Sequence, residues 1–351
     1  MIANKFFIVG CPRSGTTMLQ QALNRHSQIA IPPETAFFSM LGYSKWTQHE
    51  HLQRIKEDLE IDLPTPPARL RCTLEARTFY EQIIRLYVER MDKPSITHFG
   101  EKTNEHLSRL HRIRRLFPDA KVILLVRDGR DVALSLRRLP WTSRNLYVNF
   151  ALWLHCYRLQ KSAQRHGGLP LICVRYEDLT KDPEKELRAI LTFLGLPYEP
   201  QMVEGEGNAV GIPAWEHLWK ARAAEKIKPH RMGLWRQELP AEQLGILERW
   251  GSWALQELGY ELITDGRTSL PWCFHLRVAW RSLFWLVRRP RYAQAKAFWV
   301  QQHGLPSMTQ TLPHRKSRET LNYTPIGDGS ATMVAAPVTP EKSMLDRERR
   351  S

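Results

Sequence analysis

The run VGCPRSGTTML (Val9–Leu19), near the start of the chain, contains a set of residues that could take part in chemistry. It includes two glycines separated by four residues. The spacing from Gly10 to Gly15 matches a strand-to-helix loop whose backbone amides surround a phosphate group. The triphosphate-binding version has a lysine directly after the second glycine, where this chain has Thr16. Arg13 supplies a cation inside the loop, and hydroxyl groups come from Ser14, Thr16 and Thr17. The loop predicts a phosphate-like ligand held without an obligatory metal; a turn that binds nothing is the alternative.

A second candidate anion site lies in the segment VILLVRDGRDVALSL (Val122–Leu136). Arg127 follows an apolar strand directly, and Ser135 comes eight residues later, inside the helix that follows. Ligands of open α/β sheets bind at the carboxyl ends of the strands, so a guanidinium and a hydroxyl there fit a second, separate phosphate. The alternative is a charged turn in which Arg127 and Arg130 form local ion pairs with Asp128 and Asp131.

The elements that must position these groups are short apolar strands alternating with amphipathic helices. Strands are expected at Lys5–Gly10, Lys121–Val126 and Leu169–Tyr176, and helices at Thr16–His26 and Thr73–Met91. This alternation predicts an α/β protein with a mostly parallel sheet and helices on both faces.

Composition restricts the classes of partner and compartment. The net charge of +15 favours anionic partners such as nucleotide phosphates, acidic lipid, nucleic acid or an acidic acceptor. Five scattered cysteines without a C-x-x-C pair predict reduced thiols, with neither a disulfide framework nor a zinc site. No run reaches the roughly 18 uncharged apolar residues of a membrane-spanning helix, and the first strand leaves no room for a signal peptide. We expect a cytoplasmic protein, with peripheral binding at the inner membrane face as an alternative.

The C-terminal quarter differs in character from the rest of the chain. Residues 267–304 contain seven lysines or arginines and no acidic residue, and Arg277, Arg281 and Arg288 share one side of a helical wheel opposite a Trp/Phe/Leu/Val face. We expect a main domain at 1–265, a basic amphipathic helical extension at 266–304 and a disordered tail at 305–351. The helix could contact a membrane through 270–300, or it could pack on the body or on a second subunit of a homodimer.

Three segments together resemble the sulfotransferases that use 3′-phosphoadenosine 5′-phosphosulfate (PAPS): FFIVGCPRSGTTML, GEKTNEHLSRLHRIRRLFPDAKVILLVRDGRDVALSL and VRYEDLTKDPEKELRAILTFLGLPYE. The resemblance is to the bacterial branch and to the tyrosylprotein sulfotransferases, and it extends from about Ile2 to Tyr260. It implies a P-loop NTPase-like three-layer sandwich and transfer of a sulfuryl group from PAPS to a hydroxyl or amine, with no metal. It also implies that Arg127 and Ser135 hold the 3′-phosphate. The 5′-phosphosulfate would be held by Arg13, Ser14, Gly15, Thr16 and Thr17.

The same resemblance implies catalytic roles. Sulfuryl transfer needs a base for the acceptor proton and cations over the leaving phosphate. Glu34, in IPPETAFF, would be the base, and Lys102, in GEKTNEHL, would neutralise the leaving group with help from Arg13. A helix-capping carboxylate and a solvated lysine are the alternatives for Glu34 and Lys102. Glu101 is expected to pair with Lys102 or Arg13 and orient it.

Weaker expectations concern three further donor contacts and two histidines. Tyr176, Arg231 and Gly233 are expected to contact the donor, although packing accounts equally well for Tyr176. The cytosolic branch uses a histidine as base, but neither His26 nor His98 lies in its motif.

Two rival functions stay open, and so does the acceptor. The rivals are a P-loop kinase-like phosphotransferase and a catalytically inactive membrane or nucleic-acid adaptor on the same fold. The missing loop lysine argues against the kinase. The expected acceptor is a glycan, lipid, peptide tyrosine or small metabolite, and no nucleic-acid substrate is expected.

Overall fold

The computed structural model describes most of the first 264 residues and short stretches beyond them. The described residues are 4–91, 93–139, 142–204, 210–213, 216, 220, 226–227, 232–264, 273–274, 276–278, 280, 322–326 and 332–336. Arg231 and most of the segment 266–304 lie outside this set. Their predicted roles, and the division of the chain into three parts, therefore remain predictions.

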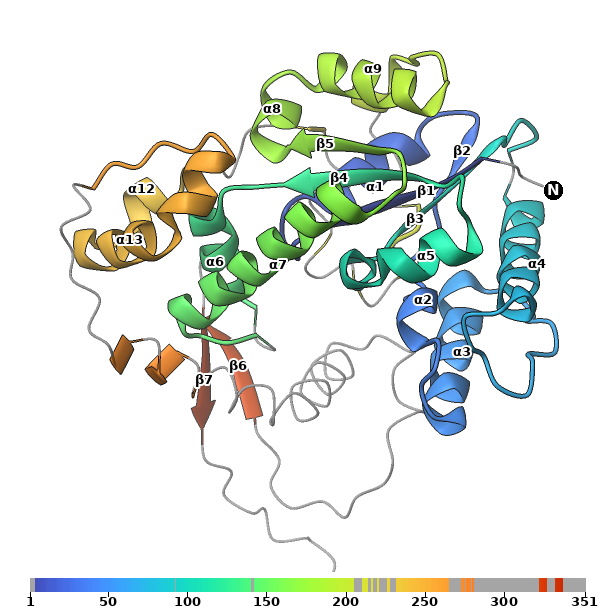
Figure 1. Ribbon diagram of the computed structural model, residues 1–351, viewed down its shortest axis with the longest axis horizontal. Coiled ribbons are helices and arrows are strands. Elements are labelled where there is room, and N and C mark those ends of the chain that lie inside the picture. The colour runs from blue at the N-terminus through green and yellow to red at the C-terminus, as the bar shows by residue number, and fades with distance from the viewer. Residues whose placement is uncertain are drawn as a thin grey trace, which may run out of the picture.

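A five-stranded, all-parallel sheet forms the centre of the molecule, with strand order β2-β3-β1-β4-β5 (Figure 1). Its strands are β1 (Asn4–Gly10), β2 (Ile29–Ala30), β3 (His98–Lys102), β4 (Lys121–Val126) and β5 (Leu171–Arg175). In the register of β1 with its two neighbours, Ile8 lies beside Lys102 and Gly10 beside Leu125. The glycine loop, Lys102 and Arg127 therefore all emerge at the carboxyl edge of the sheet.

Helices cover both faces of this sheet. One face carries α1 (Thr16–Asn24), α8 (Tyr176–Lys181), α9 (Pro183–Leu194) and α10 (Gln201–Glu204). The other carries α2 (Phe37–Met40), α3 (Lys45–Leu59), α4 (Leu74–Arg90), the 3-10 helix η1 (Asn104–Arg109), α5 (Leu110–Leu116), α6 (Gly129–Arg137), α7 (Leu146–His166), α12 (Trp235–Glu238) and α13 (Ala241–Glu257). Figure 1 shows α7 and α5 lying along one side of the strands.

The period of two along the strands creates two separate cores. Phe6 and Ile8 of β1 pack with α1 and α9, whereas Phe7 and Val9 pack toward the larger group of helices. Both sides of each central strand are therefore apolar, which is why β1 and β4 are nearly continuous hydrophobic runs. The predicted α/β class, with a parallel sheet between two helical layers, is confirmed.

The main departure from the predicted elements is β3, which the apolar pattern does not indicate. Its sequence HFGEK is mostly polar, yet all five residues are buried. Within the segment predicted as a disordered tail, Asn322–Ile326 (β6) and Thr332–Ala336 (β7) pair as an antiparallel two-stranded sheet. No helix in the described part of the chain is long and apolar enough to cross a membrane.

Candidate active site

The glycine loop connects β1 to α1 and depends on two glycines for close packing. A Cβ on Gly10 would lie 2.6 Å from the backbone oxygen of Leu125 in β4. Gly15 has a φ of 95°, and a Cβ there would lie 2.5 Å from the ring of Tyr176. Arg13 also has a positive φ, 74°, so the loop combines two left-handed residues within three positions. Such a backbone turns amides inward and can form a concave anion site.

The side chains of the loop include a buried hydroxyl with no observed partner. Ser14 is fully buried, and its Oγ forms no hydrogen bond with any described residue. Thr16 begins α1 and donates from Oγ1 to the Asn104 side-chain oxygen at 3.1 Å, while Thr17 follows it in the same first turn and is half-buried. An unsatisfied buried hydroxyl is costly unless a ligand completes its hydrogen bonding. The loop therefore fits an oxyanion at the start of α1.

The two predicted phosphate motifs meet in space. Arg13 Nε donates to Ser135 Oγ at 3.1 Å, and Arg127 Nη1 donates to the backbone oxygen of Arg13 at 3.2 Å. The Arg127 guanidinium also lies over the Tyr176 ring, with its central carbon 4.1 Å from the ring centroid. Residues from β1, β4, α6 and α8 thus form one cationic cluster at the carboxyl edge.

The position of Arg127 is set by the packing of α7 against the turn after β4. The indole Nε1 of Trp153 donates to the Arg127 backbone oxygen at 3.0 Å. A Cβ on Gly129 would lie 2.3 Å from the Trp153 ring, so only glycine leaves room for it. Asp128 caps α6 by accepting from the Arg130 backbone N–H at 2.9 Å.

The charged residues of this turn have structural partners. Arg130 is paired with Asp128 and with the buried Glu248. Asp131 accepts from the backbone N–H groups of Gly233 at 2.8 Å and Trp235 at 3.1 Å. Gly233 therefore lies against the start of α6, where Asp131 Oδ2 is also 3.9 Å from Arg127 Nη2. The neighbouring Arg231 lies outside the described residues.

Glu34 and Lys102 form an ion pair at the end of β3. The Lys102 side chain is only 1% exposed and that of Glu34 is 23% exposed. Burial raises the pKa of Glu34, but the charges of Lys102 and Lys220 outweigh it and hold that pKa well below its ordinary value. Burial lowers the pKa of Lys102, against the opposing effect of Glu34. The carboxylate is thus ionised in the resting protein and is held by two cations.

Lys220 is a member of this cluster that the sequence did not reveal. Its Nζ lies 2.8 Å from Glu34 Oε1 and also bonds to Glu216, whose side chain is 8% exposed. Burial lowers the pKa of Lys220, but Glu34 and Glu216 together raise it above its ordinary value. The only sequence signal is an i, i+4 Glu–Lys pair, which is common on solvent-exposed helices.

Glu101 does not pair with Lys102 or Arg13, so that expectation is wrong. Alternation along β3 sends its side chain to the opposite face from Lys102, where Thr35 and Tyr80 donate to it, with Thr103 Oγ1 at 3.2 Å. Burial raises the pKa of Glu101 to about 7. Because Thr35 follows Glu34 directly, this network ties the Glu34 loop to β3.

The two histidines considered as bases lie away from this cluster. His98 begins β3, at the amino edge of the sheet, and its Nε2 lies 3.3 Å from the Leu194 backbone oxygen. His26 follows α1, and its Nε2 lies 2.9 Å from the Pro197 backbone oxygen. Both imidazoles therefore contact the end of α9 or the segment that follows it, and no described hydrogen bond joins either of them to the Glu34–Lys102 pair.

The parallel sheet, the glycine loop between β1 and α1, and the arginine after β4 define a P-loop-type α/β protein with an anion site at the carboxyl edge. Residues 5–200 match the family model described as the sulfotransferase family. The chain therefore belongs to the sulfotransferase family, and the resemblance seen in its motifs is confirmed.

Relatives and a solved structure agree with this assignment. The chain is 26% identical over 285 residues to nodulation protein NoeE of Sinorhizobium fredii, covering 73% of this chain and 65% of that protein. It is 26% identical over 275 residues to protein-tyrosine sulfotransferase 2 of Gallus gallus, covering 73% and 69%. The sulfotransferase domain of the Synechococcus olefin synthase superposes with a TM-score of 0.53 at 23% identity, covering 74% of this chain and 96% of that domain. The chain thus spans slightly less than two thirds of the first relative, and the structural likeness supports the fold.

Proposed function

We propose that this protein transfers a sulfuryl group from PAPS to a hydroxyl or amine acceptor by in-line displacement. The observation that carries the proposal is the position of three groups at one edge of the sheet: the glycine loop; Arg127 and Ser135, which each contact Arg13 of that loop; and the Glu34–Lys102 ion pair. These three groups correspond to the two anionic ends of one nucleotide and to the chemistry between them.

The donor-binding residues divide into two sets in this proposal. The 5′-phosphosulfate is held by the loop amides and side chains from Arg13 to Thr17, with Ser14 Oγ gaining its missing partner. The 3′-phosphate is held by Arg127 and Ser135, with Tyr176 and Gly233 beside them. A guanidinium suits this role because it offers several donors in a fixed plane.

The transfer step follows from the charges around Glu34. The acceptor hydroxyl gives its proton to the Glu34 carboxylate while its oxygen forms a bond to sulfur. The bond from sulfur to the 5′-phosphate oxygen breaks, and its electron pair stays on that oxygen. Lys102 and Arg13 stabilise the negative charge that develops there. In the resting protein Lys102 bonds to Glu34, so this step requires Lys102 to turn toward the leaving oxygen.

For the acceptor we propose a hydroxyl compound, which could be a glycan, a lipid, a peptide tyrosine or a small metabolite. The similarity to protein-tyrosine sulfotransferases supports a phenolic hydroxyl among these. A kinase-like phosphotransfer is disfavoured because Thr16 replaces the loop lysine that contacts the outer phosphates of a triphosphate. A catalytically inactive adaptor is disfavoured by the buried, ion-paired Lys102, which a binding surface does not need.

Labelled PAPS incubated with fractionated cell extract tests the proposal directly. The wild-type protein should label an acceptor, and Glu34→Ala and Lys102→Ala should each lower the rate by about a hundredfold or more. Glu75→Ala and Lys185→Ala are matched controls, because both residues are exposed and, among the described residues, neither side chain bonds to a residue of the site. Absence of any labelled product, together with no binding of adenosine 3′,5′-bisphosphate in calorimetry, would overturn the assignment. An adaptor would instead bind the bisphosphate and be unaffected by Glu34→Ala.

A further inference from the structure

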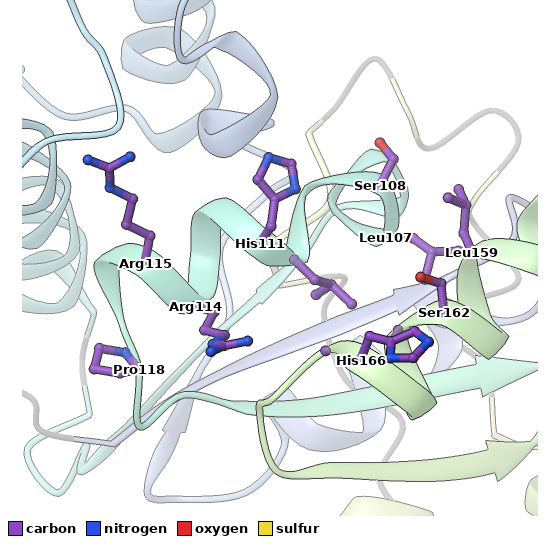
Figure 2. Close-up of a pocket in the computed structure, with 12 residues that line it drawn as sticks. Leu107, Ser108, His111, Arg114, Arg115, Pro118, Leu159, Ser162 and His166 are labelled. Atoms are coloured by element: carbon purple, nitrogen blue, oxygen red, sulfur yellow. The ribbon is translucent and has the colours of Figure 1, made fainter.

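A hollow of about 480 Å³ lies between α5 and the C-terminal half of α7 (Figure 2). Its basic and hydroxyl-bearing lining residues define what we call the basic groove: Ser108, His111, Arg114, Arg115, Ser162 and His166. No residue of the glycine loop lines it, and neither does Arg127, Ser135 or Tyr176. The basic groove is therefore separate from the proposed donor site.

The charge of the basic groove is not compensated by acidic neighbours. Four basic side chains line it, and none of its lining residues is acidic. Among the described residues, no ion pair or hydrogen bond engages the Arg114 or Arg115 side chain. Some exposed helical arginines elsewhere are paired, such as Arg85 with Glu89 and Arg188 with Glu184. Burial and the repulsion of nearby arginines also lower the pKa of His111. The groove thus concentrates positive potential where a bound anion would relieve it.

Arg114 is the arginine of α5 that points toward α7. Figure 2 shows His111 and Arg115, which are four residues apart, extending to the other side of that helix, since neighbouring helical residues do not face the same way. Figure 2 shows the Arg114 side chain extending from α5 toward the end of α7, where His166 lies. A Cβ on Gly168 would lie 2.6 Å from Arg114 Nη1, so the turn before β5 leaves room for this guanidinium.

The rest of the lining indicates the kind of anion. Leu107, Leu110 and Leu159 form apolar walls, and Ser108 and Ser162 add hydroxyl groups. Guanidinium groups match the oxygens of phosphate and sulfate in shape and charge. A volume of this size suits a small molecule rather than a bare ion, because ligand sites span roughly 300–1,000 Å³.

We propose that the basic groove binds a small organic phosphate or sulfate ester, at a site distinct from the donor site. Arg114, which extends toward His166, binds the ester oxygens; Arg115 adds positive charge at the edge of the groove, and the leucine walls cover the organic part. Binding here depends on neither the proposed transfer step nor the donor, so the two assignments can fail independently.

Calorimetry on the full chain without added nucleotide tests this proposal, and substitutions in the groove separate binding in the basic groove from binding at the donor site. The probes are glucose 6-phosphate, glucose 6-sulfate, inorganic phosphate and neutral glucose. Both esters should bind, inorganic phosphate should bind at least about tenfold more weakly, and glucose should not bind. Inorganic phosphate that binds as tightly as the esters would overturn the assignment to an organic ester.

Substitutions locate the binding. The double variant Arg114→Gln, Arg115→Gln should weaken binding of both esters by about tenfold or more, since each charged hydrogen bond contributes strongly. The matched control Arg85→Gln, Arg188→Gln loses the same charge on α4 and α9 and should bind as the wild type does. Ser162→Trp fills the groove without changing its charge and should also abolish ester binding. This variant tests the proposal if the double variant fails to fold.

No ester binding by the wild type, or equal binding by the wild type and these groove variants, overturns the proposal. The groove variants should still bind the bisphosphate as the wild type does. In that case the loss of ester binding concerns the groove and not the proposed function.

Discussion

Substitution of Glu101 by glutamine should change how the stability of this protein depends on pH. Burial raises the pKa of Glu101 to about 7 from its ordinary value of 4.5. Ionisation of Glu101 is therefore harder in the folded than in the unfolded protein, so the contribution of Glu101 to the free energy of unfolding falls as the pH rises from 4.5 through 7. A gap of about 2.5 pKa units corresponds to a loss of roughly 3 kcal/mol above that range. Glu101→Gln keeps the shape and removes this titration.

Urea unfolding of both proteins between about pH 5 and pH 8 measures the effect. The wild type should lose roughly 3 kcal/mol relative to the variant over this range. A constant offset between the two curves reflects only the changed hydrogen bonds with Thr35 and Tyr80, so the slope is the informative quantity. His106 Nδ1 lies 3.6 Å from Glu101 Oε1, and burial lowers the pKa of His106 to about 3, so His106 adds its own pH dependence below about pH 6.5. Because His106 is present in both proteins, its contribution cancels in the difference between them. A difference that does not vary with pH would refute the reasoning, and Glu75→Gln, at an exposed position, should give a flat difference.

Three further substitutions test the site. Gly15→Ala places a Cβ against the Tyr176 ring at a residue whose φ is positive. It should abolish measurable bisphosphate binding in calorimetry and lower the free energy of unfolding by about 1–3 kcal/mol. Wild-type affinity for the bisphosphate would contradict this. Ser135→Ala removes the hydroxyl beside Arg13 and should weaken bisphosphate binding by about tenfold with little change in melting temperature; an unchanged affinity would exclude Ser135 from the donor site. Lys220→Met leaves the buried Glu216 and the Glu34 carboxylate without this cation and should lower the free energy of unfolding by about 3 kcal/mol in urea at neutral pH; an unchanged free energy of unfolding would contradict that structural role.

The apolar strands and the glycine loop could be predicted because their signals are local. β4 coincides with the predicted Lys121–Val126, and α4 (Leu74–Arg90) differs from its predicted range by one residue at each end. The loop spacing by itself placed Arg13 and Ser14 beside a helix N-terminus. These features depend on hydrophobic periodicity and backbone conformation within a few residues, and both can be inferred from the local sequence.

The partners of polar residues could not be predicted, because they come from distant segments. Sequence reasoning identified Glu34 and Lys102 but assigned Glu101 to the wrong neighbours, since it did not recognise β3 as a strand. In a strand adjacent side chains point to opposite faces, so Glu101 and Lys102 cannot share a partner cluster. That error follows from using hydrophobicity to find strands, a signal that a buried polar strand lacks.

The sequence by itself determined the alternation of strands and helices and the loop that can hold an oxyanion, because glycine spacing and strand periodicity act over short distances. The family followed from the resemblance that its three motifs carry. Only the tertiary structure decided that Arg127 bonds to the backbone of Arg13, that Lys220 joins the Glu34 pair, and that α5 and α7 enclose a basic groove. Each of these depends on the packing of elements far apart in the chain. Packing fixes distances that no spacing along the sequence specifies.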